Sequence, residues 1–171
     1  NIELPNSLIT IGESAFCNCS RLTSIELPKS LTAIGGYSFY NCRQLMSIKI
    51  PNGVTTIKWA AFYNCSSLTS VEIPSSVTVI QGEAFKGCVS LKSVEIPNGV
   101  TDIYPSVFED CSGLMSVEIP NSVKSIWDKA FNGCISLRSV EIPDNVMIIE
   151  EYAFSGCNKL QFKEYGNAKY L

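Results

Sequence analysis

Residues 68–90 read LTSVEIPSSVTVIQGEAFKGCVS, and units of this length and pattern follow one another along the chain without insertion or deletion. The proline of the unit returns every 23 residues, at positions 5, 28, 51, 74, 97, 120 and 143. A phenylalanine and a cysteine keep the same interval, from Phe16 to Phe154 and from Cys19 to Cys157. A fixed period of this length is typical of a solenoid, in which each unit buries its apolar face against its neighbours. The sequence therefore predicts one elongated repeat domain.

The first part of the unit predicts a short strand. Ser70 to Ile73 alternates polar and apolar residues, with β-branched side chains turned inward and Glu72 turned outward. Pro74 should end this strand, because proline cannot donate to a sheet ladder. Val77 and Ile80 then suit a second short strand on the opposite side of the coil.

The second part of the unit predicts a compact turn. Gly82 should open it, and four apolar residues that follow have helical spacing: Ala84, Phe85, Cys88 and Leu91. This stretch is too short for more than one or two turns of 3-10 or α-helix. Stacked on its neighbours, each coil should bury about seven apolar side chains, each worth roughly 1.5 to 3 kcal/mol when large and fully buried. An isolated coil should not fold, whereas a stack should.

The composition excludes several classes of protein. The net charge is −3, from 13 basic and 16 acidic residues, and the chain contains no histidine. Nucleic-acid binding is not expected, because it requires a basic surface that displaces phosphate counterions. Membrane insertion is not expected either, since no apolar stretch approaches the length of a membrane-spanning helix. Without histidine, a metal-ligand cluster or a phosphate loop, we expect no enzyme, no catalytic residue, no metal site and no cofactor.

Seven of the eight cysteines occupy the same position of the repeat. In a solenoid they form one column, and an odd-numbered interior column has no natural disulfide pairing. Free cysteine is readily buried, so we expect a ladder of reduced, packed thiols. The eighth, Cys17, is the one expected to be exposed and oxidisable.

The motifs resemble one known family. The spacing Leu22-x-x-Ile25-x-Leu27 matches the core of leucine-rich repeats, and residues 11–19, with Gly12, Ala15 and Phe16, closely resemble the 23-residue treponemal-type repeat of BspA-like surface proteins. The resemblance implies a β-rich, right-handed leucine-rich-repeat solenoid of the α/β class. Its concave parallel sheet should have about seven short strands, with second short strands and 3-10 or short helical turns on the other side.

We expect the repeat domain to span residues 1–160, and residues 161–171 to begin a truncated, non-repeat C-terminal segment. The chain starts in mid-repeat and reads as a fragment of a longer protein. Because repeat arrays need polar caps and neither end offers one, the fragment should tend to associate end to end.

Outward-facing residues provide the candidates for partner binding. The outward strand position carries Glu3, Glu26 and Lys49, and then the candidate residues Glu72, Glu95, Glu118 and Glu141. This column of carboxylates either serves a cationic partner or is a solvated, partly self-neutralised surface. Lys49 interrupts the column, and Lys92 and Arg138 are expected to reach it. Aromatic residues outside the core give two further candidate patches, one at Tyr37, Tyr40, Trp59 and Tyr63, the other at Tyr104 and Trp127. These rings either form an interaction surface or shield the edge of the solenoid.

The function expected from the family resemblance is a non-catalytic protein-binding domain of a bacterial cell-surface or secreted protein. Attachment to host matrix or cell-surface proteins, or to other cells, is a role attributed to members, so the expected partner is a protein. The alternative is a rigid spacer that presents other binding domains.

Overall fold

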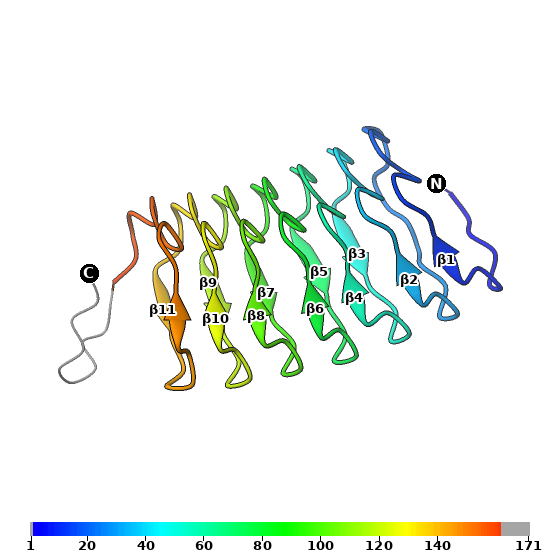
Figure 1. The fold of residues 1–171 in the computed structure, drawn as a ribbon. Helices are drawn as coiled ribbons and strands as arrows, with labels where there is room; N and C mark the ends of the chain where they lie inside the picture. The colour runs from blue at the N-terminus through cyan, green and yellow to red at the C-terminus, as the bar shows by residue number, and fades with distance from the viewer. Residues whose placement is uncertain (1, 162–171) are drawn as a thin grey trace.

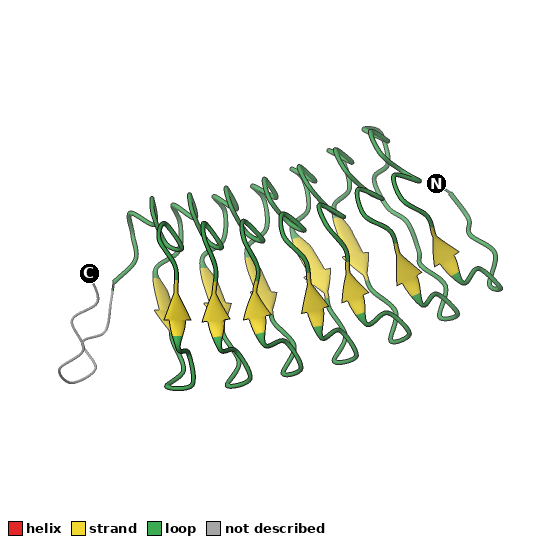
Figure 2. Ribbon diagram, viewed as in Figure 1, coloured by secondary structure: helices red, strands yellow, loops and turns green. Residues whose placement is uncertain are grey.

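The chain winds as a solenoid in which each 23-residue repeat contributes one coil, and successive coils stack side by side (Figure 1). The computed structural model describes residues 2–161. Within them the coils consist of short parallel strands joined by turns (Figure 2). The predicted solenoid is thus confirmed, and the 161–171 segment lies outside the described residues except for Gln161.

The predicted strand of the repeat forms one side of the solenoid. Its members pair in parallel with identical repeat positions opposite one another, as in Val94 with Val117 and Val117 with Val140. An isolated bridge between Ile2 and Ile25 continues the pattern toward the N-terminus. The strands are β3 (Ser47–Lys49), β5 (Ser70–Glu72), β7 (Ser93–Glu95), β9 (Ser116–Glu118) and β11 (Ser139–Glu141).

The second strand of each repeat forms the opposite side. Here too the pairing is parallel, in the order β1-β2-β4-β6 and, separately, β8-β10-β12. From β1 to β10 the repeating isoleucine is buried, as in Ile34 paired with Ile57, whereas both isoleucines of β12 are exposed. The strands are β1 (Thr10–Ile11), β2 (Ala33–Ile34), β4 (Thr56–Ile57), β6 (Val79–Ile80), β8 (Asp102–Ile103), β10 (Ser125–Ile126) and β12 (Ile148–Ile149).

The compact segment after the second strand contains turns instead of the expected helical turns, and residues 2–161 include no helix. The reason is a left-handed backbone at two positions of every repeat, as at Ser14 (φ 56°) and Asn18 (φ 61°), which interrupts any run of helical angles. Each turn is closed locally, for example from Cys17 N to Ser14 O at 3.0 Å. The turns of the first six coils are also bonded to the next coil, as from Phe16 N to Ser38 O at 2.7 Å.

One of the two left-handed positions follows residue chemistry and the other does not. The position before each repeated cysteine carries Asn, Asp or Gly, the residues that tolerate this conformation best. The earlier position carries residues that do not favour this conformation, such as Glu83. The turn itself begins at Gly82, as expected from the sequence.

The repeated apolar columns form one continuous core. Phe85, Cys88 and Leu91 are fully buried, as are their counterparts in the neighbouring coils. The phenylalanine rings from Phe16 to Phe154 stack nearly parallel, with centroids 5.2 to 5.7 Å apart. Each coil thus supplies one layer of a stack that continues through the solenoid.

The cysteine column is a ladder of free thiols, as expected. Each thiol from Cys42 to Cys157 donates to the phenylalanine carbonyl of the preceding coil, at Sγ to O distances of 3.1 to 3.2 Å. Burial raises the pKa of Cys42 and of Cys111 to about 12. Cys17, expected to be the exposed thiol, is half-buried, as are Cys19 and Cys157.

Candidate functional site

The outward side of β5, β7, β9 and β11 carries the predicted carboxylate column. Strand register places Glu95 opposite Glu118 and Glu118 opposite Glu141, and all three are exposed. Neighbouring strands lie about 5 Å apart, so these like charges stand in direct sequence across the sheet. We call the outward residues Glu72, Glu95, Glu118 and Glu141 the glutamate face.

One cation neutralises part of this face. Lys49 Nζ lies 2.6 Å from Glu72 Oε2, with the two side chains 79% and 68% exposed. Ion pairs so open to solvent contribute about 0 to 1 kcal/mol, so Lys49 changes the charge pattern more than the stability. Between β7 and β11 the carboxylates have no ion-pair partner among residues 2–161.

The expected compensation by Lys92 and Arg138 is wrong. Neither side chain lies within ion-pair distance of a glutamate in the described part of the chain; Lys92 Nζ instead lies 3.4 Å from the site of a Cβ at Gly113. Both residues precede their strands, at the end opposite the glutamate. They belong to a basic edge, defined by the exposed cations that fall between the repeated cysteine and the strand: Arg21, Arg43, Lys92, Arg138 and Lys159.

Sequence reasoning missed this basic edge, although aligning charges by repeat position would have found it. In residues 2–161, the four positions after the cysteine hold these five cations and no acidic residue. Four large apolar side chains are exposed along the same edge, namely Met46, Val89, Met115 and Ile135. Opposite charges are therefore segregated to the two ends of the strands instead of neutralising one another.

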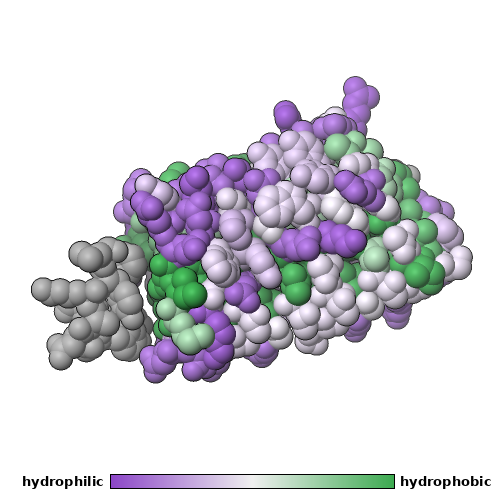
Figure 3. Space-filling model, viewed as in Figure 1, coloured by the Kyte–Doolittle hydropathy of each residue, from purple (hydrophilic) through white to green (hydrophobic). Residues whose placement is uncertain are grey.

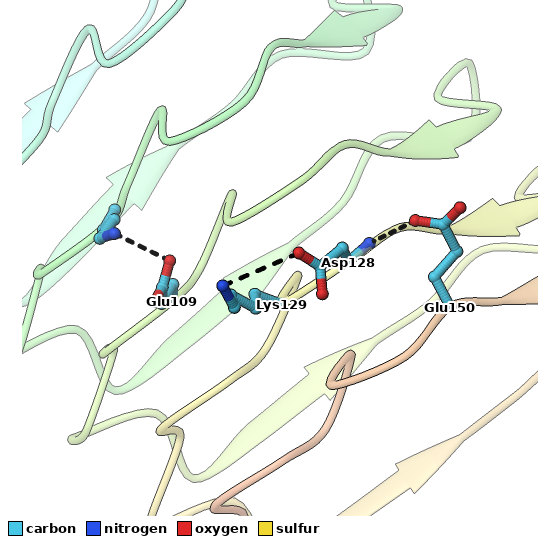
Figure 4. A network of polar contacts seen from close by, with 5 residues as sticks. Glu109, Asp128, Lys129 and Glu150 are labelled. Atoms are coloured by element: carbon cyan, nitrogen blue, oxygen red, sulfur yellow. Dashed lines mark hydrogen bonds and ion pairs between the residues drawn. The ribbon is translucent and has the colours of Figure 1, made fainter.

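Two of the candidate tyrosines form an ordered stack on the turns. The rings of Tyr40 and Tyr63 are stacked with centroids 4.8 Å apart, and Lys86 Nζ lies 6.0 Å from the Tyr63 centroid. Lys86 in turn forms an ion pair with Glu109 at 2.9 Å, drawn as the dashed line at Glu109 in Figure 4, and both side chains are mostly buried. Tyr40, Tyr63, Lys86 and Glu109 occupy the same repeat position in four successive coils, so together they form one row of contacts across the turns.

The electrostatics of this ion pair follow from its partial burial. Burial opposes charge on Lys86, but the hydrogen bond and attraction of Glu109 outweigh it and raise the pKa of the ammonium. Burial likewise opposes charge on Glu109, and hydrogen bonds from Lys86 and Ser106 outweigh it and lower the pKa of the carboxyl. Tyr40, Tyr63 and this ion pair therefore stabilise the turns. Their side chains are at least half-buried in contacts with one another and are not fully available to a partner.

The other two aromatics of the first patch are free at the surface. Tyr37 is 37% exposed and Trp59 is 42% exposed. The Tyr37 ring is tilted against Tyr40, with centroids 5.9 Å apart. The Trp59 ring covers Gly82, where an added Cβ would lie 2.5 Å from its Cζ3 atom. The absence of a side chain at Gly82 therefore leaves room for the Trp59 indole.

The second aromatic patch is not brought together as a stack. Trp127 is half-buried and its Nε1 donates to Asp102 Oδ1 at 3.2 Å, whereas Tyr104 is exposed. The two rings form no stacked pair among the described residues. Next to Trp127, polar contacts tie the coils together, since the Asp128 N–H donates to Glu150 Oε2 at 3.0 Å (Figure 4).

Other kinds of site find no support in the described residues. Within 2–161, no group of three or more His, Cys, Asp or Glu side chains is placed to hold a metal ion. No helix in that range is long and apolar enough to span a membrane.

Stacked 23-residue coils, parallel strands on both sides and a core of phenylalanine and cysteine columns define a leucine-rich-repeat solenoid. The chain belongs to the family described as the BspA type leucine rich repeat region, whose model matches residues 1–115 and 101–167 in six copies. A search of the curated proteins finds no match.

Solved structures of bacterial leucine-rich-repeat proteins agree with this assignment. A T. pallidum leucine rich repeat protein is 34% identical over 94% of this chain and 77% of its own, with a TM-score of 0.89. A Bacteroides ovatus protein is 36% identical over 91% of this chain, with a TM-score of 0.87. A protein from Faecalibacterium prausnitzii, described as a leucine rich cell surface protein, is 32% identical over 97%, with a TM-score of 0.72.

The chain spans only part of two of these relatives, 41% of the B. ovatus protein and 53% of the F. prausnitzii protein. The likeness therefore establishes the family and the fold of this repeat domain.

Proposed function

We propose that this chain is a non-catalytic protein-binding domain that docks a basic segment of a protein partner on the glutamate face. The observation that carries the proposal is the register of Glu95, Glu118 and Glu141, which stand side by side, exposed and without an ion-pair partner in the described residues. The fold tolerates this repulsion although lysine is accepted at the same position, as Lys49 demonstrates.

A cationic partner would remove the repulsion within the column. Carboxylates about 5 Å apart repel by roughly 1 kcal/mol per pair when well solvated. A lysine or arginine placed between two of them would gain attraction to both. Because the strands are short and rigidly paired, the column is already in place before the partner arrives, which reduces the ordering cost of binding.

We further propose that the domain acts at the cell surface or in a secreted protein and contacts host proteins or other cells. The family assignment and the F. prausnitzii relative described as a cell surface protein support this location. Free thiols buried in the core fit such a setting, because they are shielded from oxidants.

The test is the capture of this domain by immobilised host matrix proteins and by a lysine-rich peptide. We expect binding that weakens as salt is raised, and that falls at least tenfold when Glu95, Glu118 and Glu141 are all replaced by Gln. The matched control changes three exposed acids elsewhere to amides, namely Asp110, Asp144 and Glu151. An equal loss of affinity in both variants would mean that net charge, and not the glutamate face, determines binding, and this would refute the proposal. A failure to capture any basic partner would refute it as well.

A rigid spacer that presents other domains is the second candidate. It is favoured by the continuity of the phenylalanine stack and of the hydrogen bonds between turns, which make the solenoid one stiff body. A spacer would leave capture unchanged in the triple glutamine variant.

A further inference from the structure

A hollow opens on the side of β1, β2 and β4, beyond the C-terminal ends of these strands. It encloses about 270 Å³. Three glycines line it, Gly12, Gly35 and Gly36, which we call its floor, and the other lining residues include Tyr37 and Trp59. On this side of the molecule the surface is a mosaic of hydrophilic and intermediate residues, with hydrophobic residues toward the two ends (Figure 3).

The hollow exists because two coils omit the side chains that fill the same positions elsewhere. The equivalents of Gly12 and Gly35 in later coils are Lys58, Gln81, Tyr104, Trp127 and Glu150. Gly35 has a structural reason, since an added Cβ would lie 2.5 Å from Glu13 N. Gly12 has none, because a Cβ there would meet nothing within 4 Å and its φ is not left-handed. The absence of a side chain at Gly12 keeps the floor open without serving the fold.

The aromatic wall is fixed in position before any ligand arrives. The Trp59 ring rests on Gly82, and its backbone N–H donates to Gln81 Oε1 at 2.9 Å. Tyr37 occupies a left-handed position, φ 54°, which a bulky side chain disfavours. Its backbone N–H donates to Trp59 O at 3.0 Å, which links the two aromatic residues across adjacent coils.

We propose that this hollow binds a neutral sugar ring, stacked on the exposed indole of Trp59. A pyranose offers a face of C–H groups, which suits the electron-rich face of an indole. Its hydroxyls lie at the ring edge, and each one both donates and accepts. The polar side chains of the lining match that edge, since Glu13 accepts, Lys58 donates and the Gln81 amide can donate.

The same lining disfavours the other ligands that aromatic walls attract. The lining carries one charge of each sign, Lys58 and Glu13, so it offers no net attraction to a cationic or an anionic ligand. A proline-rich peptide packs between aromatic ridges, whereas this hollow is also lined by the charged residues Lys58 and Glu13. The proposed site lies on the strand side opposite the glutamate face, so it is independent of the proposed protein partner.

Tryptophan fluorescence provides the test, because the chain has two tryptophans. In a Trp127→Phe protein only Trp59 reports, and in Trp59→Phe only Trp127. The probes are glucose, galactose, mannose and N-acetylglucosamine with their short oligomers. We expect a saturable change for at least one of them in Trp127→Phe. Its affinity should fall at least tenfold when Gly12→Leu plugs the floor, and less when Gly12→Ala is made.

Thermal unfolding of each variant controls for the fold, because Gly12→Leu should leave the midpoint unchanged. Three results would overturn the proposal: no saturable response to any sugar, equal affinity in the Gly12→Leu variant, or saturation by a proline-rich peptide but not by sugars. Replacing Glu95, Glu118 and Glu141 by Gln should leave sugar binding intact, so this test and that of the glutamate face fail separately.

Discussion

The inward and outward columns of the same coils obey opposite rules. Inward, Phe85 and Cys88 meet a copy of themselves above and below, so each layer depends on its neighbours having the same residue. On the outward side, the repeat position that holds Gly12 in the first coil holds Trp127 in the sixth, and the coils still pair in register. The comparison teaches that the interior of this protein determines the fold, while the departures from the repeat on its surface carry what is particular to it.

The largest expected effect concerns the thiol ladder at alkaline pH. Burial raises the pKa of five thiols in the folded state, Cys42, Cys65, Cys88, Cys111 and Cys134; for Cys134, a hydrogen bond with Cys157 contributes most. In the unfolded chain they ionise from about pH 8.5 upward. The free energy of unfolding should therefore fall as pH rises above that value, by roughly 1 kcal/mol per pH unit for each thiol.

Urea unfolding in the presence of a reductant at pH 8, 9 and 10 measures this slope. A variant with Cys65, Cys88 and Cys111 changed to Ala should lose about three fifths of it, since two of the five buried thiols remain. A stability that does not change over this pH range would mean that the ladder is not buried as the structure has it.

The next effect tests whether stacking from both sides matters. Phe85→Ala in the middle of the stack should cost about 3 to 5 kcal/mol, because it empties a fully buried site between two rings. Phe16→Ala should cost less, since Phe16 is half-buried and has one ring neighbour. Chemical denaturation compares the two variants, and equal costs would contradict the dependence of each layer on two neighbours.

Loss of the ion pair between Lys86 and Glu109 should have a smaller effect on stability, because the pair lies on the turns outside the apolar core. With the pKa of Glu109 lowered, its contribution is present at neutral pH and lost as pH falls through the lowered value. Glu109→Gln should therefore destabilise by about 1 kcal/mol near pH 7 and by less at pH 3. Thermal unfolding at both pH values checks this, and an equal loss at both would exclude the charge as the cause.

The architecture could be predicted from the sequence because it depends on what repeats. Val71, Ile80 and Phe85 recur at one interval, and burial of such columns leaves one arrangement of coils. The sequence could not show that the expected helical turn is missing. Glu83 adopts a left-handed backbone there, and glutamate is not a residue type that indicates this conformation. Glu83 adopts it where its N–H donates to Pro105 O of the next coil at 3.1 Å, a contact that the residue type does not reveal.

The candidate sites were predictable as residues but not as surfaces. The exposure of the glutamate column follows from strand alternation alone. By contrast, separating the exposed Trp59 from the stacked Tyr63 required knowing which rings find a neighbour in the next coil. The failure of Lys92 to reach the column has a similar origin, since it lies at the other end of its strand from Glu95.

The most direct test of the central claim is one paired measurement on the variant with Glu95, Glu118 and Glu141 changed to Gln. The unfolding free energy and the affinity for a basic partner are determined on the same sample. We predict that stability stays the same or rises by a few tenths of a kcal/mol as repulsion is relieved, while affinity falls at least tenfold. A variant that unfolds more easily yet binds as tightly would contradict the division between an interior that folds and a surface that binds.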